Sequence, residues 1–254
     1  MVPSRAMTTA DTSAARAALA PTGALRVGIN YGNFLLVTRG TGGTDTRGIV
    51  VDLARELGRR LNVRVEFVGF DQAGPMADAA KTGAWDVAFL GAEPLRAGEI
   101  DFTAAYLEIP VTYLVPAGSR IVSIAEVDRV GVRIAVAGKS AYDLYLSRTI
   151  QHATLVRAEG IEGSFQLFVR EGLEALAGLK PRLVMDAEKL PGSRVLDGQF
   201  TAVQQAIGTP KGRGVGAQYL REFAEDVKAS GLIAQAIGRH GVRGVSVAPA
   251  APAR

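Results

Sequence analysis

Three short apolar runs near the start of the chain, separated by two helical segments, constrain the fold more than any other feature. The runs cover residues 25–29, 63–68 and 86–90, which are strand lengths. Residues 49–61 place apolar side chains at a helical period, and residues 71–82 form a second helical segment. This strand–helix–strand–helix–strand order implies a parallel sheet with right-handed crossovers. We therefore predict an α/β fold.

One arginine follows the third of these strands. The strand ends at Gly91, and Pro94 suits the first turn of a short helix that would contain Arg96. Open α/β sheets bind ligands beyond the carboxyl ends of their strands. Arg96 is therefore the first candidate for a binding residue, and another strand is predicted after it at residues 111–115.

The second half of the chain continues the alternation of strands and helices. Ser140 with Asp143 three residues later predicts a capping box, so a helix should begin at Ser140. The free N–H groups and positive dipole of such a helix end favour an anion. Further strands are predicted at residues 131–136, 154–156, 173–177 and 194–196, and further helices at residues 164–169, 181–190 and 219–238.

Residues 85–116 resemble the corresponding segment of the family-3 periplasmic solute-binding proteins, the amino-acid receptors of ABC importers. The resemblance covers residues 24–240 and implies a two-lobed type II periplasmic-binding-protein fold. Each lobe would be a mostly parallel sheet flanked by helices, and two crossing strands would join the lobes. The matching residues are Asp86, Gly91, Arg96, Asp101, Phe102, Thr103, Tyr106 and the strand at Val111.

The two crossing strands are expected at residues 111–115 and 201–207. They divide the chain into two lobes and two terminal segments. The expected parts are a disordered leader of residues 1–23, a first lobe of residues 24–113 and 204–245, a second lobe of residues 114–203, and a loose tail of residues 246–254.

The resemblance places a ligand's carboxylate between the lobes. Arg96 would bind the carboxylate from the first lobe, where a bidentate arginine also fixes its orientation. Ser140 and the N–H groups after it, on Ala141 and Tyr142, would bind it from the second lobe. A plain helix cap explains Ser140 equally well as local structure.

Three more candidates lie at the ends of first-lobe strands. Tyr31 and Asn33 follow the first strand, where the family supplies an aromatic wall and polar contacts to the ligand. Turn chemistry explains Asn-Tyr-Gly-Asn about as well. Gly91 ends the central strand beside the arginine turn.

The chain departs from the family pattern where the ligand's ammonium would bind. Family members place an aspartate at the end of the strand predicted at residues 173–177, and our alignment puts Gly178 there. Glu93 stands where the family usually has threonine, in a turn about two residues shorter than usual. It could replace the missing charge, pair with Arg96 three residues on, or simply favour the helix dipole.

The composition excludes several classes of site. The 254 residues contain no cysteine, and His152 and His240 lack a metal-ligand spacing. The net charge of +4 is scattered without a basic run interleaved with aromatics, so we expect no nucleic-acid partner. The sequence contains no run of about 18 apolar residues, the length that a membrane-spanning helix needs. We expect neither a cofactor nor a metal, and we expect the protein to be a monomer.

The predicted function is a solute-binding protein that closes on a small carboxylate-bearing ligand, an amino acid or related organic acid, and delivers it to an ABC permease. The resemblance implies a periplasmic location, but residues 1–23 show no signal-peptide core. A cytoplasmic ligand sensor is therefore one alternative. The other is an enzyme of the cyclohexadienyl dehydratase type, which needs a general acid such as Glu93 or Glu108.

Overall fold

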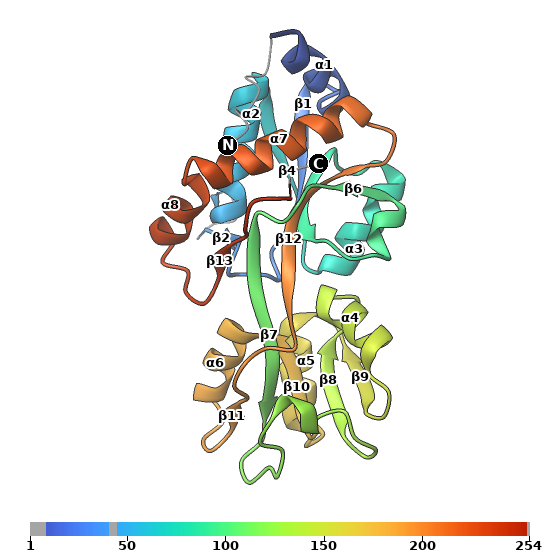
Figure 1. Ribbon diagram of the computed structural model, residues 1–254, viewed down its shortest axis with the longest axis vertical. Coiled ribbons are helices and arrows are strands. Elements are labelled where there is room, and N and C mark those ends of the chain that lie inside the picture. The colour runs from blue at the N-terminus through green and yellow to red at the C-terminus, as the bar shows by residue number, and fades with distance from the viewer. Residues whose placement is uncertain (1–8, 41–44, 253–254) are drawn as a thin grey trace.

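The computed structural model describes residues 9–40 and 45–252. They form two lobes, one above the other in Figure 1, and each lobe is a sheet flanked by helices. The main strands of both lobes lie on one hydrogen-bonded path in the order β4–β1–β5–β12–β7–β10–β8–β9, and β2 and β3 form a separate two-stranded sheet. The predicted two-lobed α/β fold is confirmed.

The first lobe is built on three parallel strands. β1 lies between β4 and β5 and is parallel to both. Every residue of β5 is buried, as expected for a strand covered by helices on both faces. The first lobe contains β1 (Ala24–Asn30), β2 (Thr38–Arg39), β3 (Thr46–Arg47), α2 (Ile49–Leu61), β4 (Arg64–Phe70), α3 (Ala73–Asp78), η1 (Ala79–Thr82), β5 (Val87–Gly91), η2 (Arg96–Gly98) and β6 (Ile100–Phe102). Two helices from the end of the chain, α7 (Gly214–Ala229) and α8 (Leu232–Arg239), also belong to this lobe.

The second lobe repeats the same arrangement on a smaller scale. β8 lies between β9 and β10 and is parallel to both. β10 is again buried throughout. The second lobe contains η3 (Ile124–Glu126), β8 (Arg133–Ala137), α4 (Ala141–Thr149), β9 (Thr154–Ala158), α5 (Gly160–Arg170), β10 (Ala175–Leu179), α6 (Lys180–Glu188) and β11 (Arg194–Val195).

Two long antiparallel strands connect the lobes, as predicted. β7 (Leu107–Val115) and β12 (Thr201–Pro210) pair with each other and run the length of the junction in Figure 1. β12 also pairs with β5 of the first lobe, and β7 pairs with β10 of the second. Because both strands contribute to both lobes, the residue numbers at which the lobes divide stay a prediction.

The expected disordered leader is wrong for the part of it that the structure describes. Residues 9–19 form helix α1 (Thr9–Leu19), and Ala15 and Leu19 are fully buried. Leu19 packs on α7 at Gly216, where an added Cβ would lie 2.7 Å from Leu19 Cδ2. An alanine-rich segment has high helix propensity, and small side chains allow close packing with few large apolar residues. Residues 1–8 lie outside the described ranges.

The expected loose tail is also wrong, except for residues 253–254, which lie outside the described ranges. β13 (Ser246–Val247) pairs with β7. Ala248 is buried, and its N–H donates to the Tyr106 carbonyl at 3.1 Å. Backbone pairing needs no particular side chain, so the Pro- and Ala-rich composition did not indicate it.

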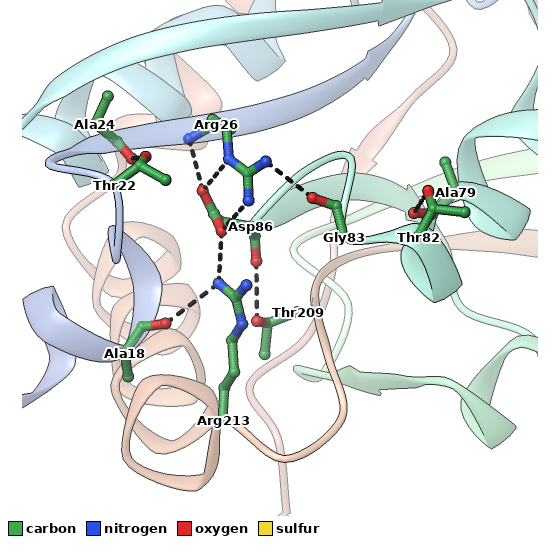
Figure 2. A network of polar contacts seen from close by, with 10 residues as sticks. All are labelled: Ala18, Thr22, Ala24, Arg26, Ala79, Thr82, Gly83, Asp86, Thr209 and Arg213. Atoms are coloured by element: carbon green, nitrogen blue, oxygen red, sulfur yellow. Dashed lines mark hydrogen bonds and ion pairs between the residues drawn. The ribbon is translucent and has the colours of Figure 1, made fainter.

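A buried ion network ties the first lobe together at the start of β5. The Asp86 carboxylate accepts from Arg26 Nε at 2.9 Å, Arg26 Nη2 at 2.8 Å and Arg213 Nη1 at 2.8 Å (Figure 2). Arg213 Nη1 also donates to the Ala18 carbonyl at 3.2 Å, which links the network to α1. The Thr209 hydroxyl donates to the Asp86 carbonyl at 2.9 Å.

None of the helices in the described ranges has the length and apolar character to cross a membrane.

Candidate functional site

A cavity of about 70 Å³ lies between the lobes. Both lobes contribute to its wall, the first through the carboxyl ends of β1 and β5 and the second through the start of α4 and the end of β10. Six of the eight predicted site residues line it: Asn33, Gly91, Arg96, Ser140, Ala141 and Tyr142. The structure thus brings together residues that are more than 100 positions apart in the sequence.

Arg96 connects the two lobes at this cavity. Its side chain is buried, Nη1 donates to the Gly91 carbonyl at 2.7 Å, and Nη2 donates to the Lys139 carbonyl of the second lobe at 2.9 Å. Lys139 has a φ of 57°, an uncommon conformation for a residue other than glycine. These two bonds use two of the five guanidinium N–H groups.

No carboxylate among the described residues forms an ion pair with Arg96; both of its hydrogen bonds go to neutral carbonyls. Burial, which disfavours the charged form, lowers the pKa of Arg96 to about 10, and the charges of Glu93 and Asp78 oppose this shift. The group remains a cation at neutral pH. An anion in the cavity would supply the missing counter-charge.

The start of α4 faces the cavity from the second lobe. Ser140 is the N-cap, as predicted, and its Oγ accepts from the Asp143 N–H at 3.1 Å. The predicted capping box is wrong, because Asp143 Oδ2 accepts from the Lys139 N–H at 2.7 Å instead of from Ser140. The N–H groups of Ala141 and Tyr142 have no partner within the helix, since they belong to its first turn.

Gly91 allows the close approach of the two lobes. A Cβ at this position would lie 2.9 Å from Ala141 Cβ of α4 and 2.8 Å from Val203 Cγ1 of β12. Real Cβ atoms do not come so close to other carbon atoms, so a larger residue would push α4 away from β5.

Two buried polar groups of the cavity wall lack hydrogen-bond partners. Asn33 Oδ1 and Tyr142 Oη are buried, and neither makes a hydrogen bond of good geometry to a described residue, although the Ser140 hydroxyl lies near Tyr142 Oη. Burial raises the pKa of Tyr142, so its hydroxyl stays neutral. Buried polar groups are usually paired, and a ligand can provide the partner here.

Glu93 and Tyr31 do not line this cavity. Glu93 Oε2 pairs with Arg148 Nη1 of α4 at 2.6 Å and so links the lobes outside it. The Tyr31 hydroxyl bonds Thr46 Oγ1 at 2.9 Å, and the Arg39 guanidinium lies 4.0 Å from the ring centroid. A second bridge joins Lys139 Nζ to Asp78 Oδ2 at 2.9 Å.

At the end of β10, Leu179 faces the cavity and the expected Gly178 does not. Gly178 faces away from the cavity, since a Cβ there would lie 2.9 Å from Leu183 Cδ2. Leu179 lines the cavity instead, because consecutive residues of a strand point to opposite faces. The position that faces the cavity from this strand is therefore apolar.

The sequence did not indicate most of the remaining wall. Gln205 is one such residue: its polar side chain is buried in β12, directly after the exposed Gln204. Asp71 is the carboxylate of the wall, but its side chain is 79% exposed and pairs with Arg39. The others are Asn30, Gly32, Leu36, Val37, Val50, Gln72, Ala73, Met76, Phe89, Leu90, Ala137, Gly138, Gly160, Ile161 and Val203.

The described residues contain no cluster of three or more metal-ligating side chains. Neither Glu93 nor Glu108 lies in the cavity wall. The general acid that a dehydratase would need is therefore not provided by either predicted residue.

Comparison of the sequence with protein-family models identifies a family. Residues 25–241 match the model of the bacterial extracellular solute-binding proteins, family 3. No curated protein sequence matches the chain.

Solved structures share the fold at low sequence identity. The L-cysteine solute receptor of Neisseria gonorrhoeae has a TM-score of 0.77 at 20% identity, covering 90% of this chain and 95% of that one. A mutant ArgBP of T. maritima has a TM-score of 0.74 at 20% identity, covering 89% of this chain and 99% of that one. An ancestral amino-acid-binding protein, a precursor of cyclohexadienyl dehydratase, has a TM-score of 0.73 at 22% identity, covering 88% of this chain and 98% of that one.

Proposed function

We propose, from the premise that the chain belongs to family 3 of the bacterial extracellular solute-binding proteins, that it closes its two lobes on a small carboxylate-bearing ligand. The ligand is an amino acid or a related organic acid. The observation that carries the proposal is a buried guanidinium, Arg96, that bonds only neutral carbonyls and lines the cavity between the lobes.

The cavity offers complementary groups from two sides. Arg96 provides a cation with unused N–H donors from the first lobe, and the first N–H groups of α4 lie across from it in the second. Hydrogen bonds to a charged group contribute about 1.5–3 kcal/mol each. Because only the closed arrangement presents both sets of donors together, carboxylate binding favours closure.

Delivery to an ABC permease follows from the family and belongs to the proposal. The two lobes are bridged outside the cavity by Glu93–Arg148 and Asp78–Lys139. These contacts exist only when the lobes meet, so the closed form presents a surface that the open form lacks. A permease can distinguish the two forms by that surface.

The experiment is calorimetric titration of the purified protein with a panel of amino acids and small organic acids, repeated on Arg96→Ala. We expect any carboxylate that binds to lose at least tenfold in affinity, about 1.4 kcal/mol. Arg170→Ala is the matched control, because its side chain is 69% exposed and pairs with Glu171. Equal affinity in Arg96→Ala and the parent would contradict the assignment of the site.

A further inference from the structure

The charges around the cavity do not balance, and this restricts the ligand. Arg96 is a buried cation of the wall, whereas the wall's carboxylate, Asp71, is exposed and neutralised by Arg39. Of the other acids near the lobe junction, Glu108 and Glu159 lie outside the cavity wall, and the following are paired. Asp78 pairs with Lys139, Glu93 with Arg148, Asp143 with Arg157, and Glu162 and Asp186 with Arg182.

A carboxylate bound to Arg96 would make this small site neutral. A zwitterion would bring an ammonium as well, and the site would again carry a net positive charge. A buried charge without a partner is strongly disfavoured. Apart from the exposed Asp71, none of these acids lies in the cavity wall, and Leu179 offers no charge from the end of β10.

The unpartnered groups of the wall suit a neutral substituent instead. Asn33 Oδ1 can accept a hydrogen bond, and Tyr142 Oη can donate or accept one. A ligand hydroxyl satisfies such groups without adding charge. A buried polar group that the ligand leaves unpaired costs free energy, so these positions select for a substituent that can hydrogen-bond.

We propose that the cavity is specific for carboxylates that lack a charged ammonium, and in particular for small 2-hydroxy acids. The inference rests on the proposed function, because it assumes that Arg96 binds a ligand carboxylate. The hydroxyl on the carbon next to the carboxylate takes the place of an amino group and bonds the neutral wall. The cavity volume of about 70 Å³ favours a ligand with a short side chain.

The first test compares pairs of ligands that share a carbon skeleton and differ only in hydroxyl against ammonium. The probes are glycolate and glycine, L-lactate and L-alanine, L-2-hydroxyisovalerate and L-valine, and L-phenyllactate and L-phenylalanine, titrated calorimetrically into the intact protein. We expect the hydroxy acid of a binding pair to bind at least tenfold more tightly. An amino acid that binds as tightly as its partner, or more tightly, would overturn the inference and leave the proposed function standing.

Failure of the proposed function has a different signature. If no carboxylate of the panel binds, or if Arg96→Ala binds them all as the parent does, the site itself is misassigned and the inference falls with it. The two failures are therefore distinguished by the same set of titrations.

The second test installs the missing charge. Leu179→Asp places a carboxylate at the end of β10, facing the cavity, and Leu179→Asn is the matched variant of similar shape without the charge. We expect Leu179→Asp to gain at least tenfold in the ratio of amino-acid to hydroxy-acid affinity relative to Leu179→Asn. An equal ratio in the two variants would contradict the proposal, and the comparison of ligand pairs in the parent does not depend on either variant folding.

Discussion

Asp86 and Arg96 are two buried charged groups of the first lobe, and they differ in whether a group of opposite charge pairs with them. Asp86 is fully buried, and two arginines and a backbone N–H satisfy its oxygens (Figure 2). Arg96, in η2 beyond the other end of β5, is nearly as buried and bonds two carbonyls without any carboxylate among the described residues. A paired charge stabilises the fold, and an unpaired charge at the lobe junction is available to a ligand. The difference separates a structural site from the proposed binding site.

The pKa values express the same contrast. Burial alone would raise the pKa of Asp86, but the hydrogen bonds from Arg26 and Arg213 outweigh it and hold the pKa below its ordinary value. For Arg96, burial is opposed only weakly, and its pKa falls to about 10. The environment therefore favours the charge of Asp86 and disfavours that of Arg96.

The largest expected effect comes from breaking the Asp86 network. Asp86→Ala leaves Arg26 and Arg213 without their shared counter-ion and should lower the free energy of unfolding by about 3 kcal/mol, measured by urea denaturation. This is the lower end of the range for buried pairs, because the arginine side chains are 27% and 20% exposed. Glu171→Ala, which breaks an exposed pair, is the control and should change stability by less than about 0.5 kcal/mol.

The same network predicts a loss of stability in acid. A carboxyl whose folded pKa is lowered stabilises the protein above its unfolded pKa, about 3.9, and loses that contribution as the pH falls through the folded pKa. The parent should therefore lose stability below about pH 4 more steeply than Asp86→Ala. Parallel curves for the two proteins would refute the role of Asp86.

A smaller effect on stability should follow from removing the unpaired charge. Arg96→Met removes a buried cation but also leaves the Gly91 and Lys139 carbonyls without their donor. Because these two effects oppose each other, the free energy of unfolding should stay within about 1 kcal/mol of the parent. Ligand binding should be lost in the same variant. If Arg96→Met destabilises the ligand-free protein as strongly as Asp86→Ala does, the distinction between the two sites fails.

The smallest effect concerns the bridge outside the cavity. Glu93→Gln removes the pair with Arg148, whose side chain is 43% exposed, and should weaken binding about two- to fivefold. The loss should be equal for hydroxy acids and amino acids, because Glu93 acts on closure. Arg148→Gln should reproduce it, and the double variant should add nothing further. A loss confined to amino-bearing ligands would instead make Glu93 a ligand contact.

Local sequence patterns determined much of the protein by themselves. The alternation of strands and helices depends on apolar periodicity within short segments, so both parallel sheets were predictable. The same holds for the helix that begins at Ser140 and for the place of Arg96 beyond β5, since a cap and a strand end are written in a few adjacent residues.

Tertiary structure alone decided which charges are paired and which side chains face the cavity. Glu93 had Arg96 three residues away, yet its partner is Arg148, 55 positions along the chain. Leu179 and not Gly178 faces the cavity, which is a matter of strand register. Ion pairs and register depend on distances across the fold, and no short stretch of sequence contains them.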